Sequence, residues 1–244
     1  MENKSALIAS HLSHTFIGEH NVRLEVLHDL SFEVARGSFL SIVGPSGGGK
    51  STLLRILAGL MRSNHGIVRL GVATQAMIFQ NFAIFPWLTV RENIEFGLKM
   101  RGVSLTKRHH TVAEKIAEVG LLGFEHKYPK ELSGGMRQRV GIARALAISP
   151  ELLLMDEPFS SLDTFTAEKL RNDLHAIWLK YKMTIVMVTH LVSEAIELSD
   201  RILVLSKRPA HVKLDLDVKL PRPRNHRSQE FYALEDKITA EIEN

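Results

Sequence analysis

The stretch GPSGGGKST, from Gly44 to Thr52, places four glycines, a lysine and hydroxyl side chains directly after the apolar run FLSIV. It fits the pattern G-x-x-x-x-G-K-[ST] at Gly44, Gly49, Lys50 and Ser51. Successive glycines let backbone N–H groups converge on phosphate oxygens, and a helix that starts here presents its positive end to the same phosphates. Lys50 can reach the terminal phosphates, and Ser51 can place its hydroxyl on Mg²⁺. The pattern therefore predicts phosphate binding.

Two carboxylates, Asp156 and Glu157, follow a second apolar run, LLLM. Acidic side chains are common after strands, where they are often simply solvated. Beside a phosphate loop they have a chemical use. Asp156 can hold Mg²⁺, and Glu157 can orient and polarise an attacking water molecule.

Polar side chains also end two further apolar runs, AMIF before Gln80 and TIVMVT before His190. Open α/β sheets bind ligands at the carboxyl ends of their strands, so we expect these side chains to lie on one edge with Lys50. A lone histidine is more often structural, but the shared edge favours a functional His190. Two interpretations of Gln80 stay open. Either it has no special role, or its amide binds Mg²⁺ or the attacking water in one position and releases it in another.

The segment LSGGMRQRV, from Leu132 to Val140, offers a second helix start at Ser133, Gly134 and Gly135. The simpler interpretation is an N-capped helix with Ser133 as the cap. The sharper one is an anion-binding helix end that contacts the phosphate of a nucleotide held by another copy of the chain.

Short branched apolar runs alternate with helical patterns, which predicts an α/β fold with a largely parallel sheet and a small antiparallel β portion. Between roughly Val90 and Ser149 the strand signal disappears, which indicates a helical subdomain insertion. We expect a single domain of 244 residues, with an α/β core over 1–89 and 150–210, a helical subdomain over 90–149 and a C-terminal extension over 211–244. In that extension, KLPRPRNHRSQ is typical of a linker, and Phe231, Leu234, Ile238 and Ile242 share one helix face that suits a docking helix.

Composition is ordinary for a globular protein, with 45% hydrophobic and 24% charged residues. The net charge of +4 is small for a protein whose main partner is nucleic acid. Cysteine is absent, so disulfides and thiolate metal sites are excluded. No apolar run has the length of a membrane span, so we expect no membrane crossing and no secretory signal.

Taken in order along the chain, these motifs resemble the ATP-binding subunits of ABC transporters. GPSGGGKST looks like their phosphate loop, Gln80 like the Q-loop glutamine and LSGGMRQRV like the family signature. LLLMDEP looks like the metal-binding aspartate and catalytic glutamate, SSLD like the loop that links two active sites, and His190 like the switch histidine. Phe16 sits where the family stacks an aromatic ring on adenine. The resemblance thus implies catalytic roles for Glu157, His190 and Gln80, metal ligation by Ser51, Gln80 and Asp156, and nucleotide contacts from Phe16, Gly44, Pro45, Ser46, Gly47, Gly48, Gly49, Lys50, Ser51, Thr52, Ser133, Gly134, Gly135 and Asp163.

The resemblance also implies ATP and Mg²⁺ as cofactors and a head-to-tail pair of ATPase subunits with two ATP molecules at their interface. NFAIFPWLTVRENIEFGL and RPRNHR are similar to importer subunits for nitrate, sulfonates, taurine and related solutes. Such subunits lie on the cytoplasmic face of the cell membrane, bound to transmembrane permease subunits and served by an external solute-binding protein. One departure is that the hairpin expected between Gly66 and Gln80 is shorter than the family's usual pattern.

Two other classes compete with a transporter subunit. A soluble ABC-type ATPase that acts on DNA or ribosomes would need a long coiled coil or a second cassette, and neither is present between Lys50 and Ser133 or elsewhere. A phosphate-loop kinase would leave the signature and His190 unexplained.

The segment FAIFPWLTV, from Phe82 to Val90, is too aromatic for an ordinary exposed loop. We expect it to form part of a groove for a short helix of the membrane subunit. The alternative is that Phe82, Phe85 and Trp87 simply pack beneath the helical insertion.

Overall fold

The computed structural model describes residues 5–243. The chain divides into two compact units, one formed by residues 1–73 with 182–244 and the other by residues 74–181. Within residues 5–243, no helix combines the length and the apolar composition that a membrane span requires.

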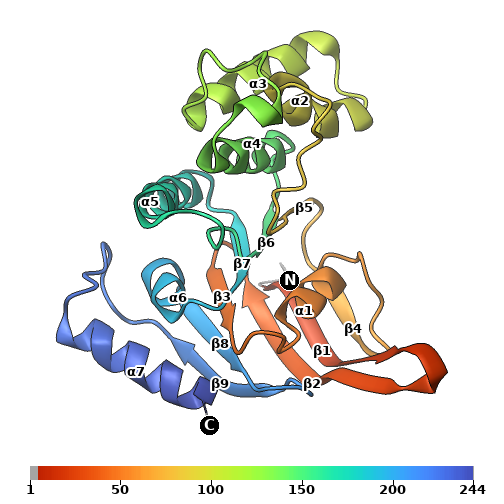
Figure 1. The fold of residues 1–244 in the computed structure, drawn as a ribbon, viewed down its shortest axis with the longest axis vertical. Helices are drawn as coiled ribbons and strands as arrows, with labels where there is room; N and C mark the ends of the chain where they lie inside the picture. Colours follow the sequence, from red (N-terminus) through yellow and green to blue (C-terminus); the bar gives the residue numbers. More distant parts are fainter. Residues whose placement is uncertain (1–4, 244) are drawn as a thin grey trace. The chain divides into compact units, whose positions relative to one another are not determined.

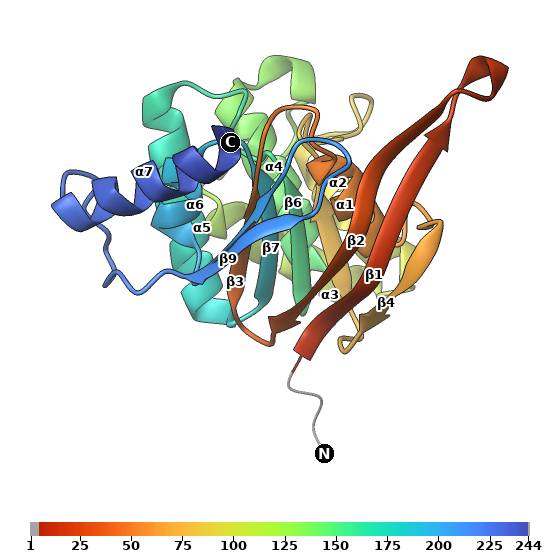
Figure 2. The same ribbon diagram turned by 90° about the horizontal axis from the view of Figure 1, so that it is seen from below.

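In the first unit, three antiparallel strands form a small sheet. Strand β1 (Ser5–Ile17) lies between β2 (Arg23–Ala35) and β4 (His65–Leu70), and a short 3₁₀ turn, η1 (Glu19–Asn21), joins β1 to β2. Figure 2 shows β1 and β2 as one long hairpin. This is the small antiparallel portion that the sequence predicts.

The same unit contains a mainly parallel set of strands in the order β7-β3-β8-β9, formed by β3 (Phe39–Val43), β7 (Thr184–Thr189), β8 (Arg201–Leu205) and β9 (Val212–Asp217). Strand β3 runs parallel to β7 and β8, whereas β9 is antiparallel to β8. Every residue of β3 and β7 is buried, as expected for parallel strands covered on both faces. Helices α1 (Lys50–Leu57) and α6 (Val192–Leu198) follow β3 and β7 in the chain.

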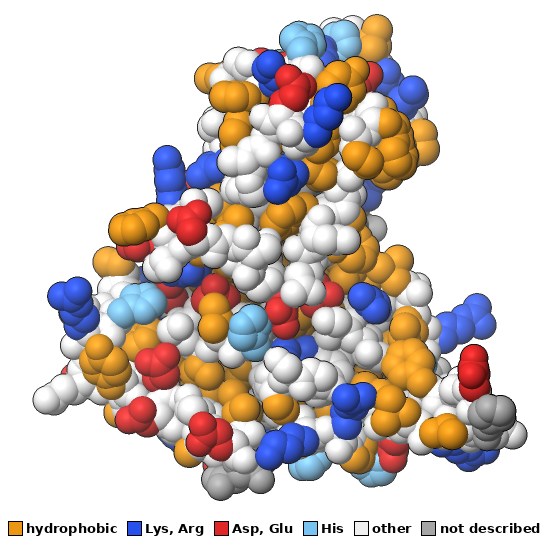
Figure 3. All heavy atoms as spheres, in the orientation of Figure 1, with side chains coloured by type: hydrophobic (Ala, Val, Ile, Leu, Met, Phe, Trp, Pro, Cys, Tyr) orange, Lys and Arg blue, Asp and Glu red, His pale blue; other side chains and the backbone are white. Residues whose placement is uncertain are grey.

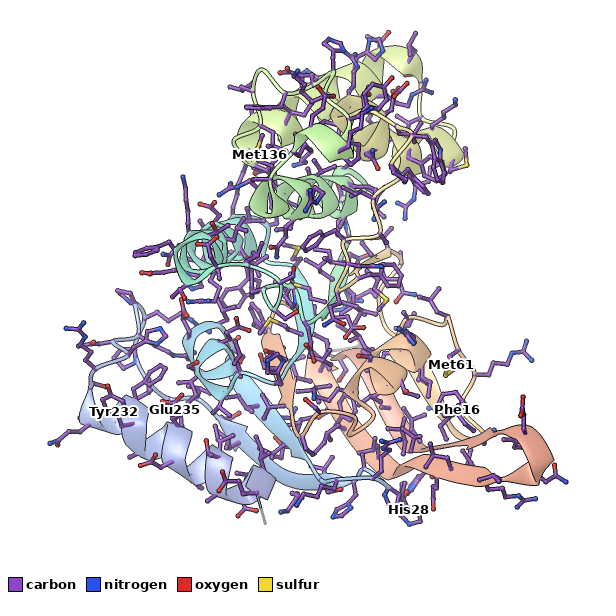
Figure 4. The ribbon with its side chains drawn as sticks, viewed as in Figure 1. Phe16, His28, Met61, Met136, Tyr232 and Glu235 are labelled. Atoms are coloured by element: carbon purple, nitrogen blue, oxygen red, sulfur yellow. The ribbon has the colours of Figure 1, made fainter. Side chains whose placement is uncertain are left out.

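Helix α7 (Gln229–Glu243) confirms the predicted C-terminal docking helix. Phe231 and Ile238 are buried in a core cluster with residues of β8 and α6, and Leu234 and Ile242 pack against it. Tyr232 and Glu235 also lie on α7 (Figure 4). The one-face pattern of apolar residues is therefore used for packing.

The segment before α7 is more ordered than a linker. The buried guanidinium of Arg224 donates hydrogen bonds to the carbonyls of Ser199 at 2.6 Å and Val218 at 3.1 Å, and to that of Ile196. Burial lowers the pKa of Arg224 to about 10. Because Ile196 and Ser199 lie at the end of α6, this arginine caps the last carbonyls of that helix.

The second unit pairs β5 (Gln75–Ile78) with β6 (Leu152–Asp156) in parallel and carries the predicted helical insertion between them along the chain. The insertion consists of α2 (Val90–Met100), α3 (Leu105–Glu118), a 3₁₀ turn η2 (Pro129–Glu131) and α4 (Gly134–Ala147), and α5 (Thr164–Tyr181) follows β6. Figure 1 shows α2, α3 and α4 grouped together. Helix α2 starts with a capping box in which Thr89 accepts from the Glu92 amide and Glu92 accepts from the Thr89 amide.

The predicted fold class, α/β with a largely parallel sheet, a small antiparallel portion and a helical insertion, is confirmed. The expected hairpin between Gly66 and Gln80 is wrong. Strand β4 pairs with β1 and strand β5 pairs with β6, so the two strands do not pair with each other. Only residues 71–74 separate the two strands, which explains why the sequence resembles a tight hairpin.

Candidate functional site

The phosphate loop of the first unit is shaped by glycines that no larger residue could replace without a collision. A Cβ atom on Gly44 would lie 2.9 Å from the carbonyl oxygen of Leu205, and one on Gly48 would lie 2.9 Å from that of Pro45. Gly47 and Gly49 have φ angles of +72° and +89°, in the left-handed region that favours glycine. The glycines therefore let the loop follow a tight path, as in loops whose backbone N–H groups converge on phosphate.

Lys50 begins helix α1 and is 4% exposed. Its Nζ donates to the carbonyls of Gly44 at 2.8 Å and Pro45 at 3.0 Å, so the ammonium group is held across the loop. The start of α1 also places the positive end of its helix dipole at the phosphate loop. A further cation lies near the loop, because Arg208 Nη2 is 3.1 Å from where a Gly47 Cβ would be. No motif predicts this arginine.

His190 follows β7 at the same edge as the phosphate loop. Val43, the last residue of β3, is paired with Thr189, so Gly44 and His190 leave adjacent parallel strands at the same level. The Thr189 hydroxyl donates to the buried Glu194 carboxylate at 2.9 Å and accepts from the Leu191 amide at 3.1 Å, which fixes the backbone on both sides of His190. The predicted convergence of His190 with the loop is thus supported by strand register.

Phe16 lies near the end of β1, opposite Leu24 of β2, and its side chain is 40% exposed (Figure 4). The ring of the buried His14 meets it edge to face, with centroids 4.6 Å apart and an interplanar angle of 81°. A partly exposed aromatic ring can stack on another ring, which is the role that the resemblance implies for Phe16.

In the second unit, the parallel pairing of Ile78 with Met155 brings Gln80 and Glu157 together beyond the strand ends. The Gln80 amide donates to Glu157 Oε2 at 3.3 Å and to Ser160 Oγ at 3.4 Å. Glu157 has a φ of +44°, which is strained for a residue with a side chain, and Asp156 before it is 3% exposed. Two predicted site residues, Gln80 and Glu157, are therefore in direct contact.

Ser133 is the N-cap of α4, and its Oγ accepts from the Met136 amide at 3.3 Å. Met136 is labelled in Figure 4. The cap interpretation of Ser133 is confirmed, and the phosphate-contact interpretation stays a prediction. Gly135 is closely packed, since a Cβ there would lie 2.5 Å from Thr166 Cγ2. Asp163 accepts from the Thr166 amide at 3.0 Å at the start of α5, and hydrogen bonds from the Thr166 side chain and backbone lower the pKa of Asp163.

Three residues next to these sites were not expected individually, although two of them, Gln138 and Asn93, lie within segments that carry the family resemblance. Gln138 of α4 is fully buried and donates to the carbonyl of Pro158, directly after Glu157. Asn93 of α2 is also fully buried and holds the backbone of Phe85 by accepting from its amide at 2.8 Å and donating to its carbonyl at 3.1 Å. Arg144 of α4 holds the carbonyls of residues 82 and 83.

The aromatic loop divides into a buried part and an exposed part. Phe82 is 7% exposed and packs inside the unit, as the alternative interpretation expected. Trp87 is 70% exposed, and Phe85 joins it to Phe96 with ring centroids 5.6 and 4.6 Å away. Figure 3 shows hydrophobic side chains on the surface near α2. We call Phe85, Trp87 and Phe96 the aromatic face.

Comparison with known proteins matches residues 27–160 to the ABC transporter family. The chain belongs to the ABC transporter ATP-binding family. It is 45% identical over 223 residues to an ABC transporter ATP-binding protein of Methanocaldococcus jannaschii, covering 88% of this chain and 84% of the relative. It is 41% identical over 245 residues to the nitrate import ATP-binding protein NrtD of Synechocystis, covering 94% and 92%. It is 42% identical over 234 residues to the aliphatic sulfonates import ATP-binding protein SsuB of Bacillus licheniformis, covering 93% and 90%.

Among solved structures, the chain resembles the dimeric ABC transporter cassette MJ0796 with a TM-score of 0.78 and 29% identity, covering 87% of this chain and 99% of that one. A post-hydrolysis dimer of the same cassette, bound to ADP and Pi, matches with a TM-score of 0.78 and 30% identity. The chain is thus a transporter ATP-binding subunit with the fold of a dimeric cassette, and it is an ATPase.

Proposed function

We propose that this ATPase powers the import of a small oxyanion, of the nitrate, sulfonate or taurine type, through a membrane permease. The support is the similarity of nearly the whole chain to a nitrate and a sulfonate import protein. The aromatic segment before α2 and the RPRNHR segment fit the same subfamily.

The observation that carries the nucleotide role is the phosphate loop with Lys50 bonded across it. We assign the loop amides from Gly47 to Thr52, with Lys50, to the β- and γ-phosphates of ATP. Ser51, Gln80 and Asp156 supply oxygen atoms, the ligands that Mg²⁺ prefers, so the donor set fits that ion. When bound, Mg²⁺ offsets charge on the phosphates. Phe16 would stack on adenine.

For hydrolysis, we assign Glu157 as the general base that orients and deprotonates water. The Gln80 amide donates to the carboxylate oxygen Oε2 of Glu157, and a carboxylate positioned in this way can accept a proton from water. His190 would donate a hydrogen bond to the γ-phosphate. Ser133, with Gly134 and Gly135, would close on the nucleotide of a second copy, and Asp163 would lie at the same interface.

The partners follow from this assignment. We propose a paired ATPase subunit in the manner of the dimeric cassettes, and permease subunits that place the chain on the cytoplasmic face of the cell membrane. The aromatic face of Phe85, Trp87 and Phe96 would receive a short permease helix, because Trp87 and Phe96 are exposed apolar side chains and Phe85 beside them is half-buried. An external solute-binding protein would act only through the permease.

The assignment is tested with Glu157→Gln, which keeps the shape of the side chain but removes the base. Turnover should fall about 10²–10⁴-fold while ATP still binds. The variant should accumulate as an ATP-dependent dimer on size-exclusion chromatography, and Ser133→Arg should abolish that dimer. Glu168→Gln, on the exposed side of α5, is the matched control and should behave as wild type. Wild-type turnover in Glu157→Gln would show that Glu157 is not the base.

The solute is tested separately by uptake of labelled nitrate, taurine and an alkanesulfonate in cells that carry the wild-type gene or Lys50→Ala. Loss of uptake for one of these solutes alone would name the substrate class. Unchanged uptake of all three would refute the oxyanion assignment.

A further inference from the structure

The turn after Gln80 holds two consecutive residues in an unfavourable conformation. Phe82 has a φ of +60° and Ala83 has a φ of +44°, both in the left-handed region although neither is glycine. A residue with a Cβ is less stable there than glycine by a factor of about 5–30. Such a turn persists only where surrounding groups hold it.

Helix α4 supplies these groups. Arg144 donates from Nη1 to the carbonyl of Ala83 at 2.7 Å and from Nη2 to the carbonyl of Phe82 at 3.0 Å. One turn earlier on the same helix, Gly141 lies beside the backbone of Phe82, and a Cβ there would be in ordinary contact with the Phe82 carbonyl oxygen at 3.5 Å. The planar guanidinium thus fits both carbonyls of the left-handed turn at once.

The same guanidinium also reaches the aromatic face. Its carbon lies 5.5 Å from the centre of the Phe85 ring, within range of a cation–π contact. On the other side, Asn93 fixes the Phe85 amide and carbonyl. One arginine therefore touches both the turn that follows Gln80 and the first ring of the aromatic face.

We propose that Arg144 is a positioning residue that acts through the left-handed turn on Gln80, and so sets the contact between Gln80 and Glu157. The proposal rests on the proposed roles of Gln80 and Glu157 in hydrolysis. In this arrangement a displacement of Phe85 pulls on the guanidinium, which releases the carbonyls of residues 82 and 83. The turn then relaxes toward ordinary backbone angles, and the Gln80 amide moves from Glu157 Oε2.

The first test is amide hydrogen exchange of the full chain without nucleotide, which does not depend on hydrolysis. Arg144→Lys keeps the charge but loses the two parallel N–H donors of the guanidinium. The rate of amide exchange over residues 80–85 should therefore rise about tenfold. The matched control is Arg139→Lys, because Arg139 lies on the same helix and also holds a backbone carbonyl, that of Val119 at 2.8 Å, far along the chain from the turn. Equal exchange over residues 80–85 in the two variants would overturn the proposal.

The second test uses the exposed Ala83 to change the turn without touching Arg144. Ala83→Gly favours the left-handed conformation and should restore at least about threefold of the kcat lost in Arg144→Lys. Ala83→Val disfavours it and should lower kcat in the wild-type background, with the KM for ATP within about twofold in every case. No recovery by Ala83→Gly, or a loss expressed in KM alone, would refute the positioning role. If the wild-type chain hydrolyses no ATP, the proposed function fails, and the exchange result still decides the role of Arg144.

Discussion

Gly49 is the position at which a single methyl group should be most damaging to the phosphate loop. In Gly49→Ala, the added Cβ would lie 2.8 Å from Val26 Cγ1 and 2.9 Å from Leu27 Cδ2, and both neighbours are buried. Overpacking of this kind costs about 1–3 kcal/mol. The φ of +89° adds about 1–2 kcal/mol for a residue with a side chain. We therefore expect a loss of about 2–5 kcal/mol in the free energy of unfolding.

Gly59→Ala separates the two contributions. Gly59 follows the other end of α1 and has a φ of +72°, but a Cβ there would meet nothing within 4 Å. Gly59→Ala should therefore lower the free energy of unfolding only by the cost of the left-handed conformation, about 1–2 kcal/mol. Urea unfolding of both variants gives the difference, and titration with ATP gives a second comparison. Affinity should fall by at least about tenfold in Gly49→Ala, because its loop amides are displaced, and stay within about twofold in Gly59→Ala.

A third variant identifies the collision itself. Val26→Ala removes the methyl group nearest to the new Cβ. The free energy of unfolding lost on this substitution should therefore be about 1 kcal/mol smaller in the Gly49→Ala background than in the wild type. Equal losses of stability in Gly49→Ala and Gly59→Ala, together with no coupling to Val26, would refute the idea that steric contact with β2 selects glycine at residue 49.

Three further outcomes follow from the described contacts. Lys50→Ala should abolish turnover and weaken ATP binding by at least about tenfold, measured by steady-state hydrolysis and equilibrium titration; wild-type activity would contradict the phosphate-loop assignment. Burial alone would raise the pKa of Glu118, but hydrogen bonds from Lys180, Lys115 and Tyr181 hold it below 4.5. The stability that this carboxylate contributes is thus present above pH 4.5 and lost as the pH falls through its folded pKa. Glu118→Gln should therefore lower the free energy of unfolding by about 1.5–3 kcal/mol at pH 7, and by progressively less in unfolding measurements below pH 4.5. A difference between the two proteins that does not depend on pH would exclude the ionic cause. Trp87→Ala should leave hydrolysis by the isolated subunit intact but abolish co-purification with the permease, and intact co-purification would show that the aromatic face is not the dock.

The α/β core and the site residues at its strand ends were predictable because local patterns determine them. Buried parallel strands need continuous branched apolar runs, and the loop after such a strand is confined to one edge of the sheet. For this reason Gln80 and Glu157 could be expected to meet, as could His190 and the phosphate loop. Helix α5 was predictable in its full length because its apolar stripe faces the core over residues 167–178.

Other features were not predictable because they depend on contacts between distant segments. Arg224 lies in a proline- and arginine-rich stretch that has the composition of a linker, yet it is buried among carbonyls contributed by residues 196–199 and 218. The local sequence does not indicate these acceptors, since those of residues 196–199 belong to the end of α6, another segment of the chain. The same holds for the left-handed turn at Phe82 and Ala83, where the residue types argue against the conformation and the hydrogen bonds from the distant Arg144 support it.

Helix α4 links these observations, because its side chains hold the backbone just after each member of the Gln80–Glu157 pair. Gln138 donates to the carbonyl of the residue after Glu157, and Arg144, six positions later, holds the carbonyls just beyond Gln80. Six residues span about 9 Å of helix, a length over which an α-helix moves as a rigid body. A force applied at the Ser133 end should therefore act on both backbones together. If Ser133 binds a second copy's nucleotide, as we propose, that event and a displacement of the aromatic face would act on Gln80 through the same helix. ATP closure and the permease would then be coupled in the second unit by one shared element, and the Arg144 variants should weaken both responses in parallel.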